Sequence, residues 1–102
     1  MGRLIEVQDA QKCPSSLTLH TGDMLLFHAS GGRVRSGGNV VEMLGPFLQA
    51  VLGDHGNILA PVGAPNVVFF RGHRPGRAVI DVVTGDPWHA PQTTTLEISV
   101  ES

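Results

Sequence analysis

Short segments in which apolar and polar residues alternate constrain the fold of this chain most strongly. In residues 95–101 the apolar side chains occupy every second position, namely Leu96, Ile98 and Val100. A period of two is typical of a strand with one buried face. Residues 16–20 repeat the pattern, with Leu17 and Leu19 expected to face inward. Residues 16–20 and 95–101 are therefore both predicted to form half-buried strands.

Glycine and proline interrupt the chain too often for long helices. There are 13 glycines and 7 prolines among 102 residues. Such punctuation favours many short strands and turns over a helix bundle. The length suits one domain with one core. With 41% hydrophobic residues and a net charge of -2 the chain is not expected to be disordered.

Further strands are expected along the chain. Residues 3–7 are a plausible edge strand, and residues 24–29 are apolar on both faces, which is typical of a central strand. The β-rich runs 66–71 and 77–84 flank a glycine- and proline-containing turn, so a hairpin-like pair is predicted. Within the second run, one face would carry Ala78, Ile80 and Val82.

The middle of the sequence allows two interpretations. Seven apolar residues have helical spacing: Val40, Met43, Leu44, Phe47, Leu48, Val51 and Leu52. Gly45 and Pro46 interrupt them. Either Pro46 opens a short helix that ends at Gly53, or two short strands flank the Gly-Pro break. The β-rich surroundings favour the strands. The expected fold is all-β, an antiparallel β-sandwich of about seven to eight short strands in a single domain spanning residues 1–102.

Charge and hydropathy argue against nucleic-acid and membrane partners. Seven basic against nine acidic residues leave no overall basic footprint. An arrangement that could stack on single-stranded nucleic acid is present, with Phe69 and Phe70 near Arg71, Arg74 and Arg77. A solvated basic hairpin tip is the favoured interpretation. No apolar run approaches the about 20 residues of a membrane span.

The N-terminal residues carry no visible signal peptide. Glu6 stands where the apolar stretch would be. A cytoplasmic location is therefore favoured, unless the chain is a trimmed mature domain.

Neither an enzyme nor a metal protein is expected. The single cysteine, Cys13, excludes an intrachain disulfide and a Cys-based metal cage. The five histidines show no tight ligand spacing, so no metal or other cofactor is predicted. Ser36, His55 and Asp81 could be assembled into a hydrolase triad on paper, but nothing in their spacing supports it.

The second half of the chain resembles a known family. The relevant elements, in order, are Pro61 to Gly63, the strand 66–71, a turn closing on Gly76, the alternating strand 77–83, Gly85 to Trp88 and the final strand 92–100. Their order and spacing resemble the chagasin-like inhibitors of papain-type cysteine peptidases, which carry Gly-x-Gly and Arg-Pro-Trp at the corresponding places. The resemblance implies an immunoglobulin-like sandwich.

The sequence departs from the family pattern at three places. Between Ala29 and Val41 the family has Asn-Pro-Thr-Thr-Gly followed by an aromatic residue. Here the segment is glycine-rich, and only Ser36-Gly37 is similar to Thr-Gly. The first glycine of Gly-x-Gly is Pro61, and the arginine of Arg-Pro-Trp is Asp86.

The resemblance implies a reversible inhibitor of a papain-like cysteine peptidase, a protein partner that is bound without a covalent bond through loops at one end of the sandwich. Residues 30–38 would enter the cleft centrally, and two other loops would grip its flanks. The implied partner-binding residues are Arg35, Ser36, Gly37, Val62, Gly63, Asp86, Pro87, Trp88 and His89.

Trp88, the only tryptophan, has two interpretations. It would serve as a flat anchor in the interface or cap the end of the core. Two other functions also remain open at this stage. One is a non-inhibitory protein-interaction or scaffold domain of the same fold. The other is a small-molecule or metal carrier, whose ligand would raise the melting temperature.

Overall fold

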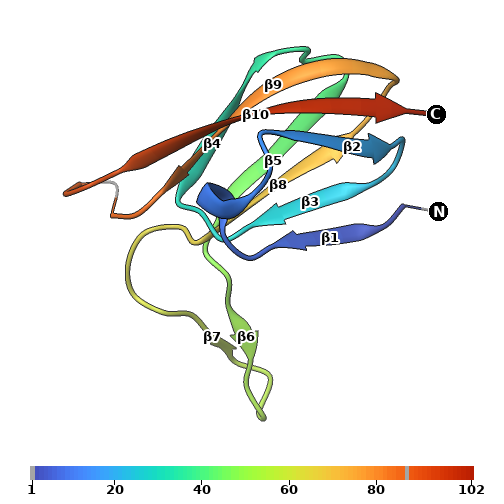
Figure 1. Cartoon of the computed structure of the whole chain (residues 1–102). Coiled ribbons are helices and arrows are strands. Elements are labelled where there is room, and N and C mark those ends of the chain that lie inside the picture. The colour runs from blue at the N-terminus through green and yellow to red at the C-terminus, as the bar shows by residue number, and fades with distance from the viewer. Residues whose placement is uncertain (1, 87) are drawn as a thin grey trace.

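Two four-stranded sheets face each other in the computed structural model, which describes residues 2–86 and 88–102 (Figure 1). One sheet has the order β1–β3–β8–β5, with bounds Leu4–Val7, Met24–Phe27, Val67–Gly72 and Val41–Phe47. The other has the order β2–β10–β9–β4, with bounds Ser16–His20, Gln92–Glu101, Gly76–Thr84 and Gly31–Ser36. A single-turn 3₁₀ helix, η1 (Ala10–Lys12), joins β1 to β2. The predicted all-β sandwich is confirmed.

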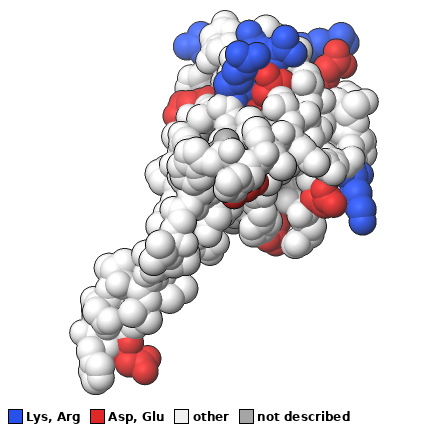
Figure 2. Space-filling model, turned by 90° about the vertical axis from the view of Figure 1, so that its left-hand side faces the viewer, with Lys and Arg blue, Asp and Glu red and all other residues white. Residues whose placement is uncertain are grey.

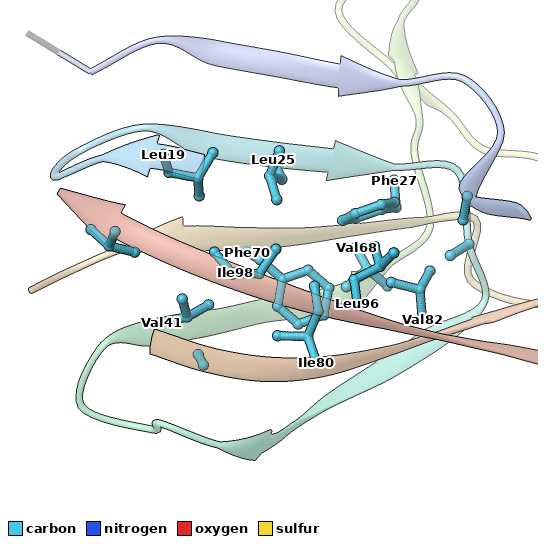
Figure 3. Packing of buried hydrophobic residues seen from close by; sticks show 14 of the residues in the cluster. Leu19, Leu25, Phe27, Val41, Val68, Phe70, Ile80, Val82, Leu96 and Ile98 are labelled. Carbon is cyan, nitrogen blue, oxygen red and sulfur yellow. The ribbon is translucent and has the colours of Figure 1, made fainter. Parts of the chain in front are cut away.

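The core lies between the inner faces of the two sheets (Figure 3). The alternation that predicted the inward faces is confirmed, because every second residue of β9 and β10 is buried: Ala78, Ile80, Val82, Leu96, Ile98 and Val100. From the opposite sheet, the ring of Phe27 meets that of Phe70 edge to face, with centroids 5.7 Å apart. Edge-to-face rings of this kind add to the stabilisation from apolar burial.

The predicted hairpin of residues 66–71 and 77–84 is wrong. The structure places β8 between β3 and β5, and β9 between β10 and β4, so residues 72–76 cross from one sheet to the other. Gly76 makes this crossing with a φ of 146°, a value that side-chain-bearing residues rarely adopt. A Cβ there would also lie 2.8 Å from Val40 Cγ2.

The strand pairs are not all antiparallel. β1 runs parallel to β3, and β2 runs parallel to β10, so each sheet is mixed. Both parallel pairs place a strand from the first twenty residues at a sheet edge. The expected edge position of residues 3–7 and the central position of β3 are confirmed.

Residues 30–38 do not form the predicted loop. Gly31–Ser36 is strand β4, which pairs antiparallel with β9. Packing explains one of these glycines: a Cβ on Gly32 would lie 2.7 Å from the carbonyl oxygen of Asp81 and 3.0 Å from the ring of Phe70. Glycine in a strand interior marks such a close approach. The glycine-rich composition, which suggested a loop, therefore belongs to a strand that packs closely on the core.

The middle of the chain is β, as favoured, and not helical. β5 continues through Gly45 and Pro46, with an irregular register between Leu44 and Phe47. Two short strands follow, β6 (Val51–Leu52) and β7 (Ile58–Leu59), which pair with each other and with no other strand among residues 2–86 and 88–102. We call residues 48–60 the arm, because Figure 1 shows this hairpin projecting away from the sandwich. Within the described residues there are thus eight strands in the sandwich and two in the arm. None of the described helical segments is long and apolar enough to cross a membrane.

Candidate functional site

Three connecting segments meet at one end of the sandwich, which we call the loop end: residues 28–30 between β3 and β4, residues 61–66 before β8, and residues 85–91 between β9 and β10. They surround a surface hollow of about 480 Å³. Its lining residues are His28, Ala29, Ser30, Gln49, Gly63, Ala64, Pro65, Asn66, Gly85, Asp86 and Trp88. The root of the arm contributes one wall through Gln49.

The β3–β4 connection is short and fixed to the neighbouring strand. The backbone N–H of Ser30 donates to the carbonyl oxygen of Val83 at 2.9 Å. The Ser30 hydroxyl donates to the Val83 and Gly85 carbonyls at 3.2 and 3.3 Å. These bonds hold the connection against β9, so residues 28–30 line the hollow as a short segment fixed to the sheet.

The β9–β10 loop presents Trp88 to solvent. The Asp86 carboxylate accepts a hydrogen bond from the Trp88 backbone N–H at 2.9 Å, and the Asp86 carbonyl accepts one from the Ala90 N–H at 3.1 Å. Trp88 is 76% exposed, so the interpretation of this residue as a cap on the core is wrong. His89 is exposed, with Nε2 3.9 Å from Asp86 Oδ2. Pro87, which the sequence places in the same loop, lies outside the described residues.

The segment before β8 is exposed backbone with a glycine at its bend. Gly63 has a φ of 135°, and a Cβ built on it would meet no atom within 4 Å. Glycine is therefore suited to this position by its backbone conformation, and the space beside it is open. Val62 is fully exposed. A hydrogen bond of 2.8 Å from the Gln49 N–H to Asn66 Oδ1 ties the two chain segments of the arm root together.

Three predicted site residues lie away from the loop end. β4 starts at the loop end, where Gly31 pairs with Val83, and runs antiparallel to β9 toward the other end. Arg35 and Ser36 therefore lie on the distal half of β4. Gly37 packs against the start of β9, where a Cβ would lie 2.5 Å from the Arg77 carbonyl oxygen. Ser36 borders a second hollow, of about 300 Å³, on that part of the sheet. The structure thus brings together Gly63, Asp86 and Trp88 but not Arg35, Ser36 and Gly37.

Charge is distributed unevenly between the loop end and the rest of the sandwich. The residues 28–30, 45–66 and 85–91 include no lysine or arginine and carry two carboxylates, those of Asp54 and Asp86. Figure 2 shows the consequence: the arm is almost entirely uncharged up to an acidic group at its tip, and most of the basic side chains in this view gather on the upper part of the body. Beside the hollow, His28 Nε2 lies 2.6 Å from Glu6 Oε2.

Two buried carboxylates belong to the framework of the sandwich. Asp23 accepts hydrogen bonds from the Arg3 guanidinium, at 2.6 Å from Nη2, and from the backbone N–H groups of His20 and Arg3. These bonds hold the pKa of Asp23 well below its usual range. Burial acts to raise the pKa of Asp81, but hydrogen bonds from Arg33 and Thr95, with the nearby arginine charges, leave that pKa lowered.

Several residues of the site were not found from the sequence. The tight turn at His28 to Ser30 was hidden by the glycines that follow it, which suggested a long loop. The arm had a usable signal, because the apolar pairs 51–52 and 58–59 flank a glycine-, aspartate- and asparagine-containing turn, a pattern typical of hairpins. Among the described residues no group of three His, Cys, Asp or Glu side chains is placed to hold a metal ion.

The fold and the loop end define a β-sandwich whose connections build an exposed surface at one end. No protein-family model matches the sequence, and comparison with curated proteins finds no match either. Solved structures do share the fold. Amebosin, determined in solution, has a TM-score of 0.56 and 16% identity, with 97% of this chain and 98% of that chain covered.

The cysteine protease inhibitor EhICP2 from Entamoeba histolytica is similar as well. Its TM-score is 0.59 with 12% identity, and the match covers 98% of this chain and 97% of that chain. At these identities the likeness establishes a shared fold over nearly the whole chain. The resemblance to the chagasin-like inhibitors is thereby confirmed at the level of the fold.

Proposed function

We propose that this protein is a reversible inhibitor of papain-like cysteine peptidases that binds its target through the loop end. One observation carries the proposal: Trp88 stands 76% exposed on a hydrogen-bonded turn beside the hollow, at one end of a fold shared with a cysteine protease inhibitor. A large aromatic residue that the core does not use is a typical anchor of a protein interface. The turn fixes its backbone before binding, which lowers the entropy lost on association.

The geometry of the loop end supports a particular division of roles. Trp88 would supply the main apolar contact, and Gly63 would allow the partner to approach the backbone closely, since nothing occupies the space beside it. The half-exposed Asp86 carboxylate would meet a basic group of the partner. Because the middle of the loop end is a hollow, the partner would insert a projecting group there, while the arm root and the β9–β10 loop lie on either side of it.

Titration of papain with the purified protein tests the proposal, with hydrolysis of a small peptide substrate as the readout. We expect inhibition that is competitive and is reversed by dilution. Trp88→Ala should weaken it by about 2 kcal/mol or more, which is about 30-fold in the inhibition constant. Leu4→Ala is the matched control, because Leu4 is 65% exposed on β1. The absence of inhibition by the unaltered protein at micromolar concentration would contradict the proposal.

A second candidate is a non-inhibitory protein-interaction domain of the same fold. The short β3–β4 connection favours it, because residues 28–30 do not project beyond the hollow as a central loop would. In that case Trp88→Ala would weaken capture of a protein partner while peptidase activity stays unchanged at every concentration of the domain.

A further inference from the structure

The arm is a hairpin that the sandwich does not cover. Val51 pairs with Leu59 and Leu52 with Ile58, and neither strand pairs with any other described strand. Its turn is closed by hydrogen bonds from the Gly53 N–H to the Asn57 carbonyl at 2.7 Å and from the Gly56 N–H to the Gly53 carbonyl at 3.0 Å. Figure 1 shows the hairpin standing clear of both sheets. Neither of its strands is therefore extended into a larger sheet by the part of the chain that the structure describes.

Exposed apolar side chains are concentrated in and around this hairpin. Val51 is 61% exposed, Leu52 and Ile58 are 70% exposed, and Leu59 is 49% exposed. Phe47, Leu48 and Val62 at its root are exposed as well. Scattered exposed apolar residues are normal, but a contiguous group of them marks an interaction surface. A two-stranded hairpin by itself is also marginally stable in water, so the arm gains most from a partner that covers it.

The root of the arm is held in place and continues into the hollow. The Asn66 N–H donates to the Phe47 carbonyl at 2.8 Å, and the Phe47 ring packs edge to face on Phe69, with centroids 6.0 Å apart. Gln49 on one side of the root and Gly63 on the other both line the hollow beside Trp88. A group of a partner protein that fills the hollow therefore lies beside the root of the arm.

We propose that the arm packs against an apolar surface of the bound peptidase outside its substrate cleft, and so adds a second contact to that made by the loop end. This inference rests on the proposed function. The charge pattern supports a protein occupant over a lipid surface, because the arm carries no lysine or arginine and has Asp54 in its turn, whereas membrane surfaces attract basic segments.

The double variant Leu52→Ser and Ile58→Thr tests the inference, since these side chains form one cross-strand pair and are both 70% exposed. Inhibition of papain-like peptidases is measured over a panel, and the tightest-bound one is used. We expect the inhibition constant to rise by about tenfold or more, while the thermal melting curve stays within the error of the unaltered protein. Leu4→Ser, which removes an equally exposed leucine from β1, should leave the inhibition constant unchanged.

The outcomes separate the inference from the proposed function. If the unaltered protein inhibits, and neither this double variant nor Val51→Ser with Leu59→Ser on the other face of the hairpin weakens inhibition, the arm does not contact the peptidase and the proposed function stands. If the unaltered protein inhibits no member of the panel, both fail. Sedimentation at the assay concentration tests whether a second copy of the protein covers the arm instead. A dimer that dissociates in the double variant would overturn the inference.

Discussion

The strands of the sandwich and of the arm both carry apolar residues, but these residues are buried in the sandwich and exposed in the arm. In the sandwich the inward side chains of β9 and β10 are almost completely buried, and Ile80 and Ile98 are not exposed at all. In the arm Leu52 and Ile58 are 70% exposed, although they too lie in paired strands. Folding explains the apolar residues of the sandwich through burial. Burial on folding does not explain the exposed apolar residues of the arm, and we infer that these residues bind a partner.

The largest effect on stability is expected from the core. Phe70 is fully buried and packs on Phe27. Phe70→Ala should lower the free energy of unfolding by about 3 to 5 kcal/mol, through lost burial and the cavity left behind. Urea unfolding measures the change. A loss below about 1 kcal/mol would mean that the two sheets do not pack around this ring as described.

A smaller effect on stability is expected from the buried Asp23 carboxylate and its hydrogen bonds, and this effect depends on pH. The pKa of Asp23 is lowered in the folded protein, so between that pKa and the ordinary value of 3.8 the unfolded chain binds the additional proton. Stability should therefore be fully present above about pH 4 and fall as the pH is lowered toward the folded pKa. Asp23→Asn should be less stable at neutral pH and flatten this acid-side decline. An unchanged decline would assign it to other carboxylates.

Thr95→Val tests how much one side-chain hydrogen bond contributes to the stability of the sandwich. The Thr95 hydroxyl donates to the Asp81 carboxylate at 2.7 Å, and the Asp81 side chain is 5% exposed. The substitution keeps the shape of the side chain and removes the donor, so we expect a loss of about 1 kcal/mol in the free energy of unfolding. Thr94→Val, on the same strand, is the control. Equal effects of the two would show that the hydroxyl of Thr95 has no particular role.

The smallest effect on stability is expected in the arm. Leu52→Ser removes an exposed side chain that contacts no part of the core cluster, so the free energy of unfolding should stay within about 0.5 kcal/mol. Denaturant unfolding beside Phe70→Ala measures the contrast directly. A loss comparable with that of Phe70→Ala would show that the arm belongs to the folded core.

The inward faces could be predicted from the sequence, but the partners of the strands could not. Alternation at Leu96 and Ile98 identifies a buried face, and this holds whichever strand lies alongside. Whether β8 pairs with β9 depends on tertiary packing, since the turn at 72–76 is compatible with a hairpin and with a crossing between sheets. Composition was misleading at Gly32, where the glycine belongs to a strand that lies close to Phe70.

The candidate site could likewise be predicted only in part from the sequence. Gly63, Asp86 and Trp88 were identified through the family resemblance, and they line one hollow. Arg35 to Gly37 were assigned to the central loop by their place in the chain and by the similarity of Ser36-Gly37 to Thr-Gly. The short turn at Ser30 moves the start of β4 forward, so these residues fall on the distal half of the strand. Because only residues 28–30 separate β3 from β4, a third of the predicted site lies away from the loop end.

Amide hydrogen exchange of the protein, measured alone and when saturated with a papain-like peptidase that it inhibits, shows which of its surfaces binds the partner. The central claim is that the loop end and the arm bind the partner. We predict slowed exchange in residues 48–66 and 85–91 on binding, with no change in the turns 37–40 and 72–76 at the opposite end. Slowed exchange confined to those two turns would contradict the claim.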